Sequence, residues 1–390
     1  MWSSWIQKYT YTFETNYDYL ELEPCDIINL QTEDATFTMK ITKVEADSGI
    51  MKFTAVSVDA AVFDQDDVGG NSSSGSQKIK TLSTTNTYFL DIPILQSSDN
   101  DPGFYIAVAP SSSNMKWSGS SLYSSNDGNN YSALKSFNKK SIIGNAISIL
   151  GNFTDGNMVD YRNTIDVILQ DGELSSCTFD QLLSGSNIAI IGNELIAFQN
   201  ATLTGTKTYR LDTLLRGRWN TDDEISNHDI GDQFIVLNSD SIRRIKDDTS
   251  SINLLKYYKD VTIGKTVNET SIDKFKNTAK GLICYPVSNF YSNRTNSGDI
   301  NMNWYVNIRG NSVLSDFEDI DPDGNFYEID VLSDDLLQIK RTIVVDNATN
   351  YTYTSSMQLA DFGTLKSSVN MIIYKKNSII GRGKGKRVIA

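Results

Sequence analysis

The sequence predicts an all-β, multidomain protein. Tyrosine and phenylalanine occur 19 and 16 times and proline only 6 times, a composition that favours strands and turns. Short segments in which apolar and polar residues alternate recur along the chain, whereas long stretches rich in Leu, Ala, Glu and Lys, which would favour helices, are absent. A chain of 390 residues is long enough for about two to four domains.

The net charge and the distribution of apolar residues argue against two classes of partner. The net charge is −13 at pH 7, which disfavours a nucleic acid bound through its phosphates. No run of about 18 apolar residues occurs, so we expect no membrane span. The cysteines Cys25, Cys177 and Cys284 are widely spaced, which predicts buried free thiols rather than a disulfide framework or a metal site.

Residues 1–64 are predicted to form a small β domain. Tyr9–Phe13 alternates aromatic residues with threonine, the pattern of a half-buried strand. The segments Phe37–Val44 and Met51–Val58 are joined by an Asp-Ser-Gly turn, which predicts a hairpin. Residues 65–82 include Gly-Gly-Asn-Ser-Ser-Ser-Gly-Ser, which has the composition of a flexible linker and marks a domain boundary.

Residues 83–280 are predicted to form a central, β-sandwich-like domain. Its strand-like segments are separated by turn sequences such as Asn-Asp-Gly, and only Phe179–Leu183 indicates a short helix. We expect the connector at 246–280 to return a strand to the central sheet. The predicted strands are Phe89–Leu95, Phe104–Ala109, Ser121–Ser125, Ile165–Leu169 and Ile188–Phe198.

Residues 281–390 are predicted to form an immunoglobulin-like sandwich. About seven short strands in about 100 residues are typical of this fold. Trp304 ends an alternating segment and is the expected core tryptophan. The segment resembles a fibronectin type III domain. Its clearest strands are Ile300–Trp304, Phe326–Leu332 and Val369–Tyr374.

The segment Tyr209–Asn238 combines two predicted strands with a charged loop between them. Tyr209, Leu211 and Leu214 have the spacing of a strand, and Phe234–Leu237 is typical of a buried one. The loop between them begins with Arg-Gly-Arg-Trp, continues with an acidic run, and contains the only histidine of the chain, His228.

This segment also carries a resemblance to a known family. The pattern LLRGRWNT, then acidic residues, a histidine and Asp-Ile-Gly-Asp, is similar to the C-terminal region of the tail-hub proteins of phages and gene transfer agents. This is the "putative phage tail protein" family, which forms the baseplate hub. Other segments match in the same order: Asp91–Leu95, Pro102–Tyr105, Trp117–Gly119, Ile191–Ile196, Asp361–Gly363 and Gly381–Gly383.

The resemblance implies a structural role at the virion tail tip, in tail assembly and host attachment. Residues 1–64 would be the end of the hub β-barrel, which in the family follows a longer N-terminal part. The family hub is a threefold ring, so the resemblance implies a homotrimer with other tail and baseplate proteins as partners. It leaves open whether the particle is a phage, a prophage remnant or a gene transfer agent.

Two roles are open for the charged loop. Arg216 and Arg218 could grip an anionic group, with His228 as a proton carrier. We expect instead that both arginines are structural anchors. Two arginines beside a carboxylate run can form bidentate ion pairs that pin the loop onto the sheet, and Gly217 would allow a sharp turn between them. The expected partners are the acidic residues that follow, namely Asp222, Asp223 and Glu224.

A calcium loop is a further candidate. Asp319, Asp321 and Asp323, with Asp330, match the spacing of D-x-D-x-D-G and a carboxylate at the twelfth loop position. Pro322 inside the loop and the lack of a predicted flanking helix weaken the match. The alternative is an acidic hairpin tip without a metal.

A carbohydrate site is the basis of the alternative function. Trp117, Tyr123 and Tyr131 could stack on a sugar ring, or could cover the edge of a sheet. The first possibility would make the chain a carbohydrate-binding, adhesive β-domain protein that binds polysaccharide at the host cell surface. No G-x-S-x-G, P-loop or HExxH pattern occurs, so we expect neither an enzyme nor a cofactor.

Overall fold

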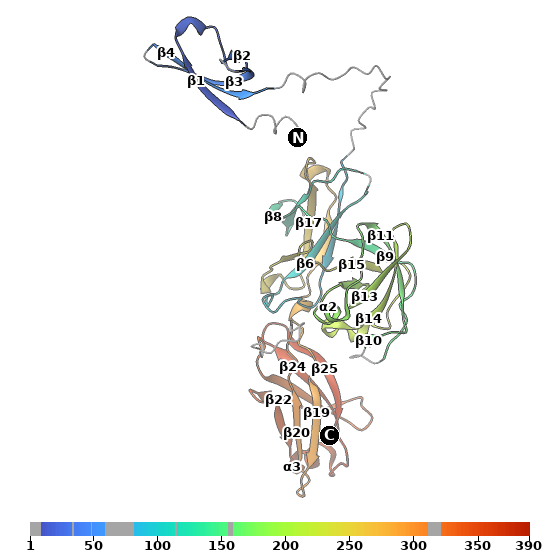
Figure 1. The fold of residues 1–390 in the computed structure, drawn as a ribbon. Helices are drawn as coiled ribbons and strands as arrows, with labels where there is room; N and C mark the ends of the chain where they lie inside the picture. The colour runs from blue at the N-terminus through green and yellow to red at the C-terminus, as the bar shows by residue number, and fades with distance from the viewer. Residues whose placement is uncertain are drawn as a thin grey trace. The chain divides into compact units, whose positions relative to one another are not determined.

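The computed structural model describes residues 9–32, 35–47, 49–58, 82–113, 115–154, 159–310 and 321–390. The chain divides into two compact units, Met1–Lys78 and Ile79–Ala390. Regular structure is almost entirely β (Figure 1), which confirms the predicted all-β, multidomain class. The predicted linker 65–82 lies outside the described residues, except for Leu82. No helix among the described residues is long and apolar enough to cross a membrane.

The first unit contains one antiparallel sheet of four strands in the order β1-β4-β3-β2. β3 and β4 form the predicted hairpin, which is therefore confirmed. Its small core consists of Ile41, Met51 and Phe53 with a few partly buried neighbours. Cys25 is exposed, so the prediction that all three cysteines are buried was wrong. The strands are β1 (Thr10–Thr15), β2 (Ile27–Gln31), β3 (Thr36–Asp47) and β4 (Ile50–Ser57).

The second unit begins with a two-sheet sandwich. One sheet has the order β16-β6-β5 and the other β18-β17-β7-β8. Phe89 and Phe104 pack against Tyr258 and Phe275 between the two sheets. The long strand β17 pairs with β7, so the connector does return a strand to the sheet. The strands are β5 (Thr85–Leu90), β6 (Phe104–Pro110), β7 (Ser120–Ser125), β8 (Ser132–Phe137), β16 (Arg243–Ile245), β17 (Leu255–Thr262) and β18 (Asp273–Lys276).

A closed β-barrel lies in the chain between β8 and β16. The sheet order is β10-β14-β11-β9-β15-β12-β13, and β13 pairs back onto β14, which closes the barrel and leaves β10 outside it (Figure 1). The sequence predicted only a sandwich-like centre. The strands are β9 (Ile143–Ala146), β10 (Val159–Asp160), β11 (Ile165–Asp171), β12 (Ile188–Ile191), β13 (Glu194–Gly205), β14 (Thr208–Leu215) and β15 (Gln233–Val236).

The barrel was not predicted because one hairpin was interpreted as a single strand. The single strand expected over Ile188–Phe198 is a hairpin of β12 and β13, turning at Gly192 with a φ of 56°. Such a φ is easily adopted by glycine. β13 then continues to Gly205 and pairs first with β12 and then with β14. The short helix α2 (Phe179–Leu183) was predicted correctly, and Thr178 caps it by accepting from the Gln181 N–H.

The C-terminal part is a sandwich of two sheets, β19-β20-β23 and β22-β21-β24-β25. This strand order is that of a fibronectin type III domain, as the sequence predicted. Trp304 is buried and meets Tyr327 edge-on, with ring centroids 5.2 Å apart. Helix α3 (Ser355–Phe362) was not predicted. The strands are β19 (Ser288–Arg294), β20 (Ile300–Tyr305), β21 (Phe326–Leu332), β22 (Ile339–Asp346), β23 (Asn350–Tyr353), β24 (Asn370–Asn377) and β25 (Gly381–Ile389).

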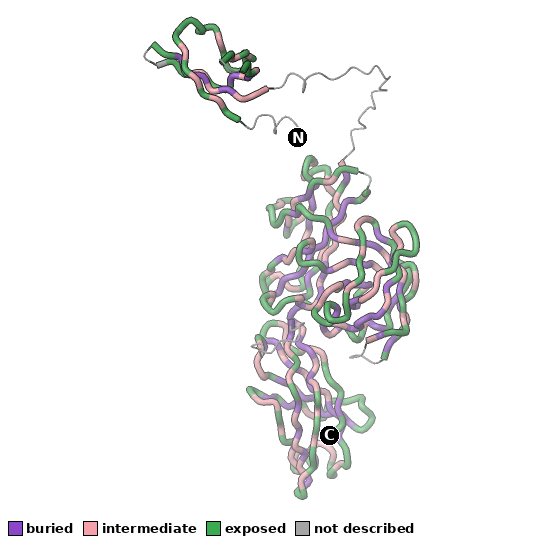
Figure 2. Tube along the Cα trace, in the orientation of Figure 1, coloured by how far each residue is buried: buried purple, intermediate pink, exposed green. Residues whose placement is uncertain are grey.

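Buried polar contacts connect these modules within the second unit. Burial follows the strands of the barrel and of both sandwiches (Figure 2). The side chain of Arg309, between the two sandwiches, is buried. Its guanidinium donates to Asp323 from both Nε and Nη2, each at 2.7 Å. It also donates to the Gly281 carbonyl at 2.6 Å and to Asn100 Oδ1 at 2.7 Å. One arginine therefore joins the C-terminal sandwich to the segment around Gly281 and to the loop between β5 and β6 of the first sandwich.

Candidate functional site

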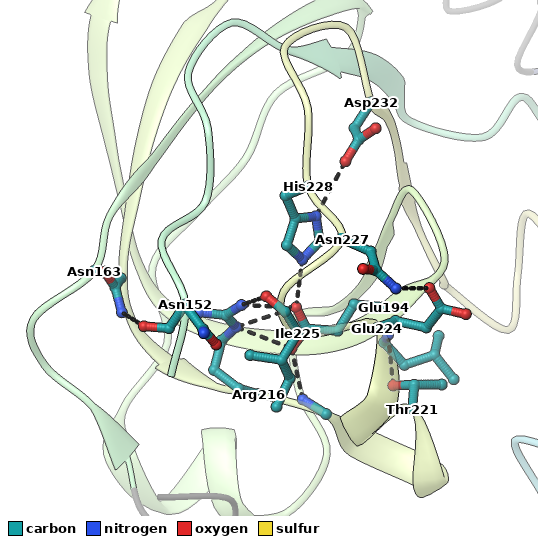
Figure 3. Close-up of polar contacts among 12 residues, drawn as sticks. Asn152, Asn163, Glu194, Arg216, Thr221, Glu224, Ile225, Asn227, His228 and Asp232 are labelled. Carbon is teal, nitrogen blue, oxygen red and sulfur yellow. Dashed lines mark hydrogen bonds and ion pairs between the residues drawn. The ribbon is translucent and has the colours of Figure 1, made fainter. Parts of the chain in front are cut away.

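The loop that follows β14 is held by Arg216, whose side chain is fully buried. Its Nε and Nη2 donate to the Glu194 carboxylate, each at 2.9 Å. Nη2 also donates to the Ile225 carbonyl at 3.2 Å (Figure 3). Nη1 donates to the Gly151 carbonyl at 2.9 Å and to Asp160 at 3.2 Å. A guanidinium has five N–H donors, and all five therefore have an acceptor.

Glu194, the first residue of β13, is the centre of this arrangement. Besides Arg216, it accepts from the Gly217 N–H and from His228 Nε2, each at 2.6 Å. Burial raises the pKa of Glu194, but the hydrogen bonds from His228 and Arg216 lower it more, so the pKa lies below its ordinary value. The carboxylate is therefore charged at neutral pH.

His228 lies between two carboxylates (Figure 3). Its Nδ1 is 3.0 Å from Asp232 and its Nε2 is 2.6 Å from Glu194, while the side chain is only 2% exposed. Burial lowers the pKa of His228, but the hydrogen bonds to Glu194 and Asp232 more than reverse this, so the pKa is raised. Both ring nitrogens are therefore engaged by carboxylates of the chain itself.

Asp160 completes the cluster from the strand β10. It accepts from the backbone N–H groups of Arg162 and Asn163, each at 3.0 Å, and from Asn163 Nδ2 at 2.7 Å. Burial raises the pKa of Asp160, and the hydrogen bonds from Asn163, Arg162 and Arg216 lower it by more. The cluster therefore ties the loops around Gly151, residues 160–163 and residues 216–232 to one end of the barrel.

The predicted ion-pair partners of the two arginines were wrong. Arg216 pairs with Glu194 and Asp160, which lie 22 and 56 positions away in sequence. Arg218 lies over the Trp219 ring at 5.1 Å and has no ion pair among the described residues. The reason is geometric: Arg216 is anchored across the barrel, whereas the predicted carboxylates, four to eight positions away in sequence from the two arginines, make other contacts.

The three acidic residues that were predicted as partners of the arginines lie at or near the protein surface. Asp222 and Asp223 are exposed and Glu224 is half-buried. Asp223 pairs with Lys384 of β25, and Glu224 accepts from Asn227 Nδ2 at 3.2 Å. Glu194 was missed, although a lone carboxylate inside the apolar segment Ile188–Phe198 is itself a signal, because a buried carboxylate needs a cation.

The backbone of this loop is in an uncommon conformation. Gly217, Trp219 and Asn220 have φ values of 55°, 51° and 67°, in the left-handed region that non-glycine residues seldom occupy. A Cβ on Gly217 would lie 2.8 Å from Asp222 Oδ1 and 3.0 Å from its Cα. Glycine is therefore required where the chain turns towards Glu194.

Each of the calcium candidates that the structure describes forms an ion pair with a cation of the chain itself. Asp321 pairs with Lys375, Asp323 with Arg309 and Asp330 with Arg382. Each carboxylate already has its own cation, and no group of three or more potential metal-ligating side chains occurs in the described ranges. The fourth candidate, Asp319, lies outside the described residues.

The three carbohydrate candidates do not share one surface. Trp117 packs against the core between the two sheets of the sandwich and donates from Nε1 to Thr85 Oγ1 at 2.9 Å. Tyr123 points to the opposite face of β7 from the buried Leu122, because successive strand residues alternate. Tyr131 lies under the Lys259 ammonium, 5.1 Å from its ring centroid. Trp117 is thus separated from the two tyrosines.

The comparison with protein families matches the barrel region of the chain. The family model described as "Rcc01698-like, C-terminal" matches residues 141–235, the range from β9 to β15 that includes Glu194, Arg216 and His228. No curated protein matches the chain.

Two solved structures resemble the chain only loosely. The chicken CNTN1 FN1-FN3 domains are 8% identical, cover 79% of this chain and 98% of their own, and have a TM-score of 0.21. A multidomain fragment of titin is 9% identical, covers 90% and 82%, and has a TM-score of 0.19. At these values the two structures carry no argument about function.

Proposed function

We propose that the chain is a structural component of the tail tip or baseplate hub of a phage, prophage or gene transfer agent particle, where it contributes to tail assembly and host attachment. The observation that carries the proposal is the match of residues 141–235 to the Rcc01698-like family, which is associated by name with gene transfer agents. The matched range is a complete barrel, and its loop sequence is the one that resembles the tail-hub proteins.

The internal construction of the second unit supports a mechanical role. Arg216 joins three loops to the barrel, and Arg309 joins the C-terminal sandwich to the first one. Removing one partner of a buried ion pair costs more than removing a surface pair. The Arg309 contacts therefore oppose bending between the two sandwiches, and the Arg216 contacts hold the loops of the barrel in place, as a component that transmits force along a tail requires.

The first unit offers edges for assembly into the proposed homotrimer. Among the described residues its sheet is open, with β1 and β2 as unpaired edges. The edge strand β2 has the uncharged sequence Ile-Ile-Asn-Leu-Gln, and Ile27 is 61% exposed. Natural edge strands usually carry charges or prolines that prevent pairing with another chain. An edge without them suits pairing with another hub subunit or a neighbouring tail protein.

Incorporation into particles tests the proposal. A tagged chain is expressed in the strain that makes the particles, which are purified on a density gradient and labelled with an antibody to the tag for electron microscopy. We expect the label at the tail tip. Particles with complete tails that lack the chain would refute the proposal.

Light scattering of the purified chain tests the trimer separately. Ile27→Lys, which adds a charge to the open edge, should convert a trimer to a monomer, whereas Lys52→Gln on the internal strand β4 should not. If the wild-type chain is a monomer, the trimer is refuted. The tail-tip role is then tested by the particle experiment alone.

A further inference from the structure

A surface cleft of about 450 Å³ lies where the sandwich meets the barrel. It is formed by the end of β6, the segment between β6 and β7, the segment between β8 and β9, and the end of β11. The residues that the argument uses are Met115, Trp117, Lys139, Lys140 and Asp171. None of them belongs to the buried Arg216 cluster, so the cleft is a separate feature of the molecule.

Three lysines and two aspartates lie in or beside this cleft, an excess of one positive charge in a chain that is acidic as a whole. Lys140 pairs with Asp171, and Lys207 lies 3.6 Å from the same carboxylate. Lys139 pairs with Asp240 at 2.9 Å. Three ammonium groups thus face two carboxylates, in a chain whose net charge is −13. The side chains of Lys139 and Lys140 are about half exposed, at 56% and 50%, and are therefore accessible to a ligand.

One wall of the cleft is the indole ring of Trp117, which is held in place by its neighbours. Trp117 is held by its hydrogen bond to Thr85 and by the core of the sandwich, yet it remains partly exposed and lines the cleft. Met115 beside it is 42% exposed. A ring that is already held in place loses little conformational freedom when a ligand stacks on it, and tryptophan offers a large planar apolar face.

From this combination we propose that the cleft binds an acidic oligosaccharide. The C–H face of one sugar ring lies on Trp117, and the carboxylates of the saccharide lie against Lys139 and Lys140. A planar apolar face beside cations and hydrogen-bonding groups matches a carboxylated sugar, which has an apolar ring face and an anionic edge. Nucleic acid is disfavoured by the overall charge. The site does not depend on the proposed role in a tail, because the isolated chain is sufficient to test it.

Calorimetric titration of the full-length chain tests this site. The probes are oligogalacturonate, a neutral malto-oligosaccharide of the same length, and a glutamate peptide of the same charge. We expect binding of oligogalacturonate alone, weakening as salt is added, because the charges are exposed. Binding of the peptide with equal affinity would overturn the proposal in favour of a general anion surface, and no binding of oligogalacturonate would also overturn it.

Variants locate the binding. Lys139→Gln combined with Lys140→Gln should weaken binding about fivefold, since each exposed pair contributes modestly. Trp117→Phe, which keeps an aromatic ring in place, should weaken it about threefold, and circular dichroism checks that it folds. Lys135→Gln on β8 and Tyr123→Ala should have no effect. The assignment to this cleft would be refuted if Lys135→Gln weakened the binding of oligogalacturonate as much as the cleft variants do. It would also be refuted if both cleft variants bound oligogalacturonate with the affinity of the wild-type chain.

Discussion

Glu194 in the barrel and Asp260 in the sandwich are both buried carboxyl groups on β strands, with opposite pKa shifts. Glu194 accepts hydrogen bonds from Arg216 and His228, and its pKa is lowered. Asp260 has no cation as an ion-pair partner among the described residues; its Oδ2 accepts from the Thr87 hydroxyl at 2.9 Å and its Oδ1 has no partner. Burial raises the pKa of Asp260 by more than nearby hydroxyl groups lower it.

The difference teaches that burial alone does not determine the charge of a carboxyl group in this protein. Burial disfavours the charged form of both residues, and only the cations beside Glu194 reverse that effect. The barrel cluster is therefore stable when charged, whereas the sandwich is more stable when Asp260 is neutral. Around Asp260 the sheets are joined by hydroxyl groups instead, such as Thr85 and Thr262 at 2.7 Å.

Removing the cation from the barrel should have the largest effect. Arg216→Ala leaves Glu194 and Asp160 buried without their guanidinium, and should lower the free energy of unfolding by about 3–5 kcal/mol. Chemical denaturation monitored by circular dichroism measures this. The control is Arg210→Ala, which removes an exposed pair with Asp166 and should cost less than about 1 kcal/mol. If both substitutions lowered the free energy of unfolding equally, the buried contacts of Arg216 would be no more stabilising than the surface pair of Arg210.

The barrel should also lose stability as the pH rises. Because the pKa of His228 is raised above 6.5 in the folded protein, its contribution is complete below pH 6.5 and is lost as the pH rises through the folded value. His228 is the only histidine, so its ring resonances in NMR spectra give the pKa directly. A measured pKa below 6.5 would contradict the two-carboxylate arrangement. His228→Gln should remove this part of the pH dependence in thermal melting.

The unpaired carboxyl group should give the smallest effect, and its substitution, unlike Arg216→Ala, should stabilise the protein. The pKa of Asp260 is raised above 3.8, so its contribution to stability is complete below pH 3.8 and is lost as the pH rises through the folded value. Asp260→Asn keeps the neutral form and should raise the free energy of unfolding at pH 7 by about 1 kcal/mol. Asp248→Asn, on an exposed residue, is the matched control. Destabilisation by Asp260→Asn would mean that the charged form has a partner.

Local sequence patterns were sufficient for many elements of the fold. The hairpin of β3 and β4, the helix α2, and the strands β14 and β15 were predicted because each depends on alternation, capping or turn residues within a few positions. Helix α3 was missed although Thr354 caps its start and Gly363 ends it with a φ of 74°. Those two residues are signals that the sequence contained.

The sequence by itself determined the all-β class, the strand–loop–strand plan around Arg216 and the need for a glycine at position 217. Only the tertiary structure decided which carboxylates Arg216 binds, that β13 closes a barrel, and that Trp117 lies apart from Tyr123. The physical reason is that hydrogen bonds and ion pairs depend on distance in space. Glu194 and Asp160 reach Arg216 only after the barrel has closed.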